Sequence, residues 1–209
     1  MHGRGGGDYA ISRRDIGMIN LMLAIPTSNA WVENVLANFD DFLLDHAANE
    51  RKAAMMAMSL VAHYPDRPEL MEAMIDLALE ELNHFRQVVR IVNQRGLTLT
   101  ADEKDPYVNQ LRDHFRKGSK RYFLDRLLSA AVIEARGAER FSLIAEALSD
   151  SHLNTFYTSL AKSEEKHHQL FLDQANNYFD TRTISDRLRD WLDIEKNVVK
   201  QLPMKPRLH

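Results

Sequence analysis

Two Glu-x-x-His motifs in this chain interrupt the apolar faces of two predicted helices. Between residues 69 and 94, apolar residues recur at the three- and four-residue spacing of one helix face, and Glu81 and His84 occupy two central positions of that face. A later stretch repeats this arrangement around Glu164 and His167. Because residues three apart project from the same side of a helix, each pair is able to hold a metal ion.

Two further predicted helices each add one carboxylate on their apolar face. Glu50 lies midway along the apolar face of a helix expected over residues 40–63, and Glu134 lies midway along one expected over residues 120–148. Each buried carboxylate would cost several kcal/mol without a counter-charge, and no lysine or arginine lies on these faces at the same level. We therefore predict a metal centre with six ligands: Glu50, Glu81, His84, Glu134, Glu164 and His167.

This set of ligands also predicts the fold. Four carboxylates offset the charge of two divalent ions, and a mixture of carboxylate and imidazole suits iron or manganese. One glutamate from each of two helices, plus a Glu-x-x-His pair from each of two others, is the arrangement of ferritin-like dimetal bundles. We expect an all-α, ferritin-like four-helix bundle with extra short helices.

Glycine and proline divide the chain into helical segments. Thr27 or Ser28 can cap a short helix, and Asp150 or Ser151 can cap the last long one. The long helices are expected over about 40–63, 69–94, 120–148 and 151–179, with a short helix over 107–116 and a final helix around Trp191. The predicted organisation is an N-terminal arm (1–27), a single domain (28–202) and a basic tail (203–209). The first residues of the arm are expected to be disordered or left over from cloning.

Composition excludes several other kinds of protein. The chain has no cysteine, which rules out a disulfide scaffold, a cysteine zinc site and an iron–sulfur cluster. This fits a reducing cytosol, and we expect a cytoplasmic location. No apolar run approaches the roughly 18–20 residues that span a membrane. With a net charge of -3, any contact with nucleic acid has to come from a local basic patch.

Helical phase also separates ligands from neighbouring candidates. Glu165 and His168 form an overlapping Glu-x-x-His on a less apolar face, so we expect them to face solvent or to support the ligands. His46 lies one turn before Glu50 and is interpreted as a buried, hydrogen-bonded histidine rather than a ligand.

Four segments around the predicted ligands carry a family signature. They are Asp45-His46-Ala47-x-x-Glu50-Arg51-Lys52-Ala53-Ala54, Glu80-Glu81-x-x-His84-Phe85, Ala131-Val132-Ile133-Glu134-Ala135-Arg136-Gly137-Ala138-Glu139-Arg140-Phe141 and Ser163-Glu164-Glu165-Lys166-His167. Together they resemble the tRNA hydroxylases of the MiaE type, from about Trp31 to the last helix. The six residues selected by phase match the iron ligands of that family, and the resemblance implies no catalytic side chain beyond them.

The resemblance implies an oxygen-dependent di-iron monooxygenase. Its substrate would be the isopentenyl group of 2-methylthio-isopentenyl-adenosine, next to the anticodon in tRNA. It would need two iron ions, dioxygen as co-substrate and an external electron donor, either a reductase or a small carrier, since no flavin or nicotinamide fingerprint is present. Two alternatives stay open: ferritin- or rubrerythrin-like handling of iron or peroxide, and a di-iron hydroxylase of a small molecule.

A basic segment with interleaved aromatic residues is compatible with an RNA substrate. Lysine and arginine attract phosphate, and an aromatic ring can stack on an unpaired base of the anticodon loop. The alternative is a solvated helix face whose aromatic residues pack inward. We predict tRNA contacts at Arg112, Arg116, Lys117, Lys120 and Arg121.

Overall fold

The structure is a computed structural model that describes residues 21–209. All regular structure in this part of the chain is helical: α1 (Asn29–Ala37), α2 (Phe39–His63), α3 (Pro68–Gln94), α4 (Pro106–Arg112), α5 (Ser119–Ala147), α6 (Ser151–Tyr178) and α7 (Thr181–Gln201). The prediction for the first residues of the N-terminal arm lies outside the described residues. Along residues 21–209, no helix combines the length and apolar character needed to cross a lipid bilayer.

The helices begin and end at residues whose chemistry starts or stops a helix. Ser28 accepts a hydrogen bond from the backbone N–H of Trp31 at the start of α1, and Asp150 accepts two at the start of α6. Gly96 follows α3 with φ of 72°, a left-handed conformation that favours glycine. The four long helices lie within one residue of their predicted bounds. The short helix predicted over 107–116 ends earlier, at Arg112.

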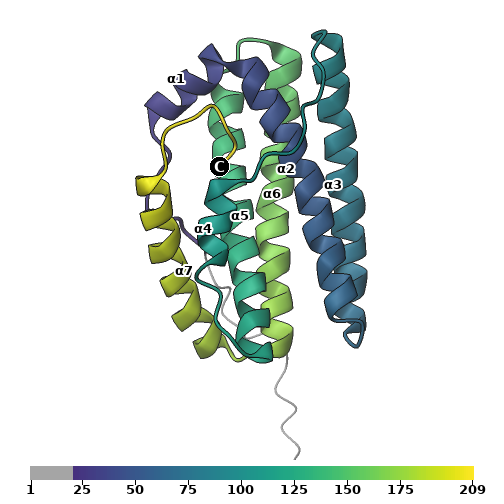
Figure 1. The fold of residues 1–209 in the computed structure, drawn as a ribbon, viewed down its shortest axis with the longest axis vertical. Coiled ribbons are helices and arrows are strands. Elements are labelled where there is room, and N and C mark those ends of the chain that lie inside the picture. The colour runs from purple at the N-terminus through teal and green to yellow at the C-terminus, as the bar shows by residue number, and fades with distance from the viewer. Residues whose placement is uncertain (1–20) are drawn as a thin grey trace, which may run out of the picture.

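Four long helices form two antiparallel hairpins, α2 with α3 and α5 with α6 (Figure 1). A crossover over residues 95–118 contains α4 and lets α3 and α5 run in the same direction. Contact is close within each hairpin and much sparser between the hairpins. This is the connectivity of a ferritin-like bundle and confirms the predicted fold class.

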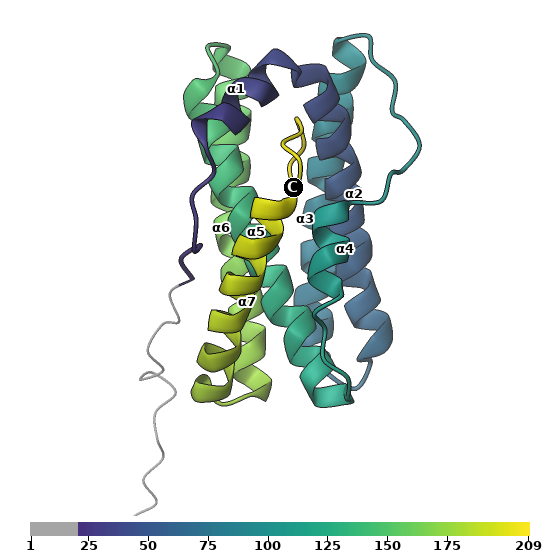
Figure 2. The same ribbon diagram turned by 60° about the vertical axis from the view of Figure 1, so that its left-hand side comes forward.

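One side of the bundle is covered by α4, α7 and the C-terminal tail. α7 packs against α4 and α5. Residues 203–209 turn back from the end of α7 toward α1 (Figure 2), where Trp31 Nε1 donates a hydrogen bond of 3.1 Å to the carbonyl of Arg207. Leu208 is buried, and His209 stacks on Tyr107 with 4.9 Å between ring centroids. The basic tail is therefore packed onto the helices.

A buried ion pair joins α7 to α5. Arg136 donates to both carboxylate oxygens of Glu195 at 2.8 and 3.0 Å, and neither residue is exposed to solvent. The hydroxyl of Tyr107 on α4 donates to the same carboxylate at 3.3 Å. Arg136 also donates to Glu139 and to the carbonyl of Ile25, so this member of the family signature holds the fold together.

Candidate metal centre

All six predicted ligands are buried in the centre of the bundle, and each long helix contributes at least one. None of the six is more than 8% exposed. Their positions are Glu50 on α2, Glu81 and His84 on α3, Glu134 on α5, and Glu164 and His167 on α6. The helices thus bring together residues that are up to 117 positions apart in the sequence.

The six side chains form two overlapping groups, in each of which one ligand atom per residue lies within 4.8 Å of the others. One group is Glu50, Glu81, His84 and Glu164, and the other is Glu81, Glu134, Glu164 and His167. Glu81 and Glu164 belong to both groups, so their carboxylates can bridge two ions. Glu50 and Glu134 can each serve one ion.

Both histidines point Nδ1 toward the carboxylates. Nδ1 of His84 lies 3.4 Å from Glu81 and 3.5 Å from Glu50. Nδ1 of His167 lies 2.9 Å from Glu81 and 3.2 Å from Glu164. Nδ1 is therefore the atom that each ring can offer to a metal, while Nε2 faces away from the cluster.

The carboxylates of the cluster raise the pKa values of Glu81, Glu134 and both histidines. Burial and the charge of Glu164 raise the pKa of Glu81 to about 7 and that of Glu134 well above its ordinary value. Burial alone would lower the pKa of each histidine, but hydrogen bonds to the carboxylates raise it to about 10 for His84 and about 12 for His167. A metal ion that enters has to displace these protons.

The donor atoms fit a pair of iron ions. Oxygen and imidazole nitrogen ligands suit iron or manganese, and four carboxylates offset two divalent charges. Oε1 of Glu81 lies 2.9 Å from Nδ1 of His167, but this buried oxygen accepts no hydrogen bond from residues 21–209. A buried carboxylate oxygen in that position is costly unless a cation satisfies it.

His46 supports Glu50 rather than joining the cluster, as predicted. It is fully buried, and its Nε2 donates to Glu50 Oε1 at 2.6 Å. With the proton on Nε2, Nδ1 accepts from the hydroxyl of Tyr157 at 3.2 Å. Burial alone would raise the pKa of Glu50, but hydrogen bonds from His46 and His84 lower it below its ordinary value, so Glu50 stays ionised.

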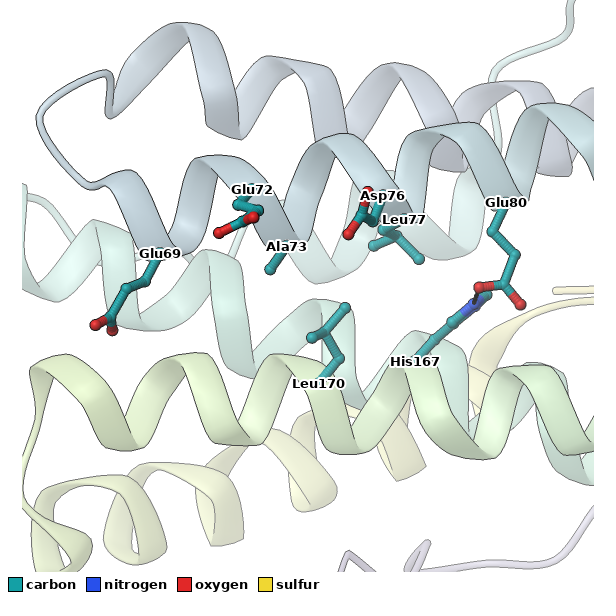
Figure 3. A pocket seen from close by; sticks show the side chains of 8 residues that line it. All are labelled: Glu69, Glu72, Ala73, Asp76, Leu77, Glu80, His167 and Leu170. Carbon is teal, nitrogen blue, oxygen red and sulfur yellow. Dashed lines mark ion pairs between the residues drawn. The ribbon is translucent and has the colours of Figure 1, made fainter.

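Two residues on the outer side of the cluster were not predicted from the sequence. Oε2 of Glu80 lies 3.4 Å from Nε2 of His167 (Figure 3). Oε1 of Glu80 lies 3.9 Å from Nε2 of His84. Ser163 Oγ donates to Glu80 across the two helices. A carboxylate on the outer nitrogen fixes the orientation of a metal-binding ring. Glu80 and Ser163 each precede a predicted ligand histidine by four residues, and that spacing could have identified them.

The overlapping motif lies outside the cluster. Glu165 is exposed and His168 is partly buried, and neither belongs to the two groups that could hold a metal among residues 21–209. This agrees with the interpretation drawn from helical phase. Glu165 is therefore a natural control for Glu164, its neighbour on the same helix.

The predicted RNA contacts lie together, around the connection from α4 to α5. Asp125 is fully buried, and Arg116 donates to it three times, at 2.8 to 3.0 Å, from its backbone and side chain. Arg187 donates to the same carboxylate at 2.7 Å. The charge of Arg116 is thus neutralised inside the fold. The other four, which remain exposed, are Arg112, Lys117, Lys120 and Arg121.

A four-helix bundle with a buried Glu, Glu-x-x-His, Glu, Glu-x-x-His cluster defines a ferritin-like protein of the dimetal carboxylate class. Within that class, the chain matches the profile of the tRNA-(MS[2]IO[6]A)-hydroxylase (MiaE) family over residues 15–209, and it belongs to that family.

Two relatives described as tRNA 2-(methylsulfanyl)-N(6)-isopentenyladenosine(37) hydroxylase align with the chain. One, from Pseudomonas putida, is 40% identical over 167 residues, which are 80% of this chain and 81% of the relative. The other, from Salmonella typhimurium, is 32% identical over 141 residues, or 68% of this chain and 52% of the relative. A solved structure from Synechococcus, described as protein 43 with aldehyde deformylating oxygenase activity, has a TM-score of 0.85 and 36% identity. The match covers 90% of this chain and 94% of that one.

Proposed function

We propose that this chain is an oxygen-dependent di-iron monooxygenase that hydroxylates the isopentenyl group of 2-methylthio-isopentenyl-adenosine, next to the anticodon in tRNA. The proposal rests on the family match over residues 15–209 together with the buried cluster of six ligand side chains. The description of the Pseudomonas relative supports the choice of substrate. Because that substrate is tRNA, we propose a cytoplasmic location.

In this proposal two iron ions are held by the two groups of the cluster, with Glu81 and Glu164 shared between them. When bound, iron supplies the activation of dioxygen that carbon–hydrogen bond oxidation requires. One oxygen atom enters a C–H bond of the isopentenyl group, and the other leaves as water with two protons. A separate reductase or small electron carrier supplies the two electrons.

The protein's own contribution is to hold the ligands and exclude water. Glu80 lies 3.4 Å from the outer nitrogen of His167 on the groove side, and His46 orients Glu50 from the core side. The rings of Phe141 and Tyr157 pack against His46 with centroid distances of 4.8 and 5.6 Å. This aromatic layer keeps water from the buried side of the cluster.

Product analysis tests the proposal directly. Iron-loaded protein is reduced and given oxygen and tRNA that carries the methylthio-isopentenyl base, and the digested nucleosides are weighed by mass spectrometry. We expect one added oxygen atom on that nucleoside and none on other nucleosides. An unchanged nucleoside, with two irons per chain and a competent reductant, would reject the proposed substrate.

A second candidate function is a di-iron oxygenase of a small molecule. It is favoured by the Synechococcus structure, whose described activity is aldehyde deformylation. The two functions separate in one competition assay. A small-molecule oxygenase consumes an aldehyde and leaves the tRNA nucleoside unchanged, whereas the tRNA hydroxylase does the reverse.

The exposed part of the basic segment gives a separate prediction about RNA binding. Replacing Lys117, Lys120 and Arg121 together with alanine is expected to weaken tRNA binding. The slope of log affinity against log salt should fall by about 1 for each phosphate that these side chains neutralise in the parent. Fluorescence anisotropy at several salt concentrations measures both effects.

The control for this variant replaces three cations of α7 with the same change in charge: Arg182, Arg189 and Lys196. If both triple variants show the same salt slope, the segment does not bind RNA.

A further inference from the structure

The groove between α3 and α6 contains two cavities of opposite character, with the metal cluster between them. The first cavity, of about 370 Å³, extends along the N-terminal half of α3 as far as His167 (Figure 3). Four carboxylates line it, Glu69, Glu72, Asp76 and Glu80, and His167 is its one basic side chain. Phosphate groups are repelled by such a surface.

The second cavity has a volume of about 600 Å³ and lies between the C-terminal half of α3 and the first turns of α6. Its basic side chains are Arg90, Arg95 and His152. Arg95 is held by Asp40 at 2.6 Å, whereas Arg90 is exposed and has no acidic partner among residues 21–209. The carboxylate of Asp150 also lines the cavity, but it accepts backbone N–H groups at the start of α6. Arg90 is therefore the cation available to an anion.

Part of the wall of the second cavity is apolar, formed by Ile91, Leu153 and Phe156. The ring of Phe156 lies 6.3 Å from that of His46, which is hydrogen-bonded to Glu50. On the α3 side, Gln87 lines the cavity three residues beyond His84, about 4.5 Å along the helix axis. An aromatic face, apolar neighbours and a nearby unpaired cation suit an unpaired base and its phosphate.

We propose that this second cavity, bounded by Arg90, His152 and Phe156, binds the nucleotide to be hydroxylated. The base stacks on Phe156, a flanking phosphate contacts Arg90, and the apolar tail runs along α3 past Gln87 toward His84. The acidic cavity at the other end of this groove repels the flanking phosphates, so the nucleotide enters the groove at its basic end. This proposal rests on the proposed function and adds the place where the substrate enters.

The test measures binding of two RNA hairpins with the sequence of an anticodon arm by the full-length, iron-loaded protein. One hairpin carries methylthio-isopentenyl-adenosine in its loop, and the other carries adenosine. Three single variants are compared with the parent chain: Arg90→Glu, Phe156→Leu and, as a control, Arg189→Glu. Arg189 is an exposed arginine on α7, across the bundle from α3 (Figure 1). Circular dichroism and the iron content of each variant establish that the fold and the cluster are retained.

Arg90→Glu is expected to weaken binding of both hairpins about tenfold or more and to reduce the salt slope by about 1, because Arg90 no longer neutralises a phosphate. Phe156→Leu is expected to reduce the preference for the modified hairpin at least fivefold, because stacking contributes about 1–3 kcal/mol per base. Arg189→Glu should stay within about twofold of the parent.

Two results would overturn this proposal, and they differ from failure of the proposed function. If the parent chain hydroxylates the tRNA and Arg90→Glu binds both hairpins as Arg189→Glu does, the substrate enters elsewhere. If Phe156→Leu keeps the full preference for the modified hairpin, the base does not stack there. If the parent neither binds nor hydroxylates the RNA, the proposed function fails and the substrate pocket fails with it.

Discussion

Replacing Glu164 with alanine is expected to abolish the binding of two irons and to lower hydroxylation at least about 100-fold. Glu164 belongs to both groups of the cluster, so its loss removes a ligand from each proposed iron. Loss of a group that only supports a metal ligand already costs about 10- to 100-fold, and loss of a shared ligand should cost at least as much. Iron per chain by elemental analysis and the yield of hydroxylated nucleoside measure the two effects.

The fold of the Glu164→Ala variant should survive. An intact fold distinguishes the loss of a metal ligand from the loss of a residue that stabilises the structure. The charge of Glu164 raises the pKa values of Glu81 and Glu134, so its removal relieves repulsion. Without added iron the melting temperature should therefore not fall, while the rise that iron gives the parent should be abolished. Glu165→Ala, at the exposed neighbouring position, should keep two irons and full activity. Two irons and parental activity in Glu164→Ala would reject the ligand assignment.

Replacing Asp125 with alanine is expected to destabilise the fold by about 3 kcal/mol and to lower the melting temperature by roughly 6–12 °C. Asp125 is fully buried and accepts hydrogen bonds from Arg116, Arg187 and Nε1 of Trp191. Arg187 is 9% exposed. Without Asp125, Asp190 at the surface is the one acidic partner that the guanidinium of Arg187 retains among residues 21–209. Urea and thermal unfolding followed by circular dichroism measure the change.

The effect of this substitution should depend on pH. Burial alone would raise the pKa of Asp125, but hydrogen bonds from Arg116 and Arg187 lower it below its ordinary value. A carboxylate with a lowered folded-state pKa stabilises the fold above its unfolded value of about 3.9, and the contribution disappears as the pH falls through the folded value. The difference between Asp125→Ala and the parent should therefore shrink below about pH 4. Asp113→Ala, an exposed aspartate at the end of α4, should change stability by less than about 0.5 kcal/mol.

The family signature on α5 illustrates how one motif mixes two roles. Glu134 lies in the metal cluster, whereas Arg136, two residues further on, is turned away from it and pairs with Glu195 of α7. Consecutive residues of a helix point about 100° apart, so a run of several residues necessarily faces several environments. Phase along α5 predicted the first role, because Glu134 interrupts an apolar face. The partner of Arg136 lies 59 residues away and no local pattern identifies it.

The basic segment before α5 shows the limit of reading charge from sequence. Arg112, Arg116, Lys117, Lys120 and Arg121 look equivalent in a run of cations. Packing separates them, because Arg116 satisfies a carboxylate buried beneath α7 and the other four remain exposed. Whether a surface cation is free depends on what the rest of the chain places beside it.

The sequence by itself determined the four long helices, the fold class and the six side chains of the cluster, because each rests on spacing within a single helix. Backbone hydrogen bonding sets a period of about 3.6 residues, so an acidic residue in phase with an apolar face must point inward. Tertiary structure alone decided which carboxylates are shared, that Glu80 and Ser163 meet across the groove, and that the groove is acidic at one end and cationic at the other. Those features depend on how one helix is rotated and shifted against another, and packing across the whole bundle sets that relation.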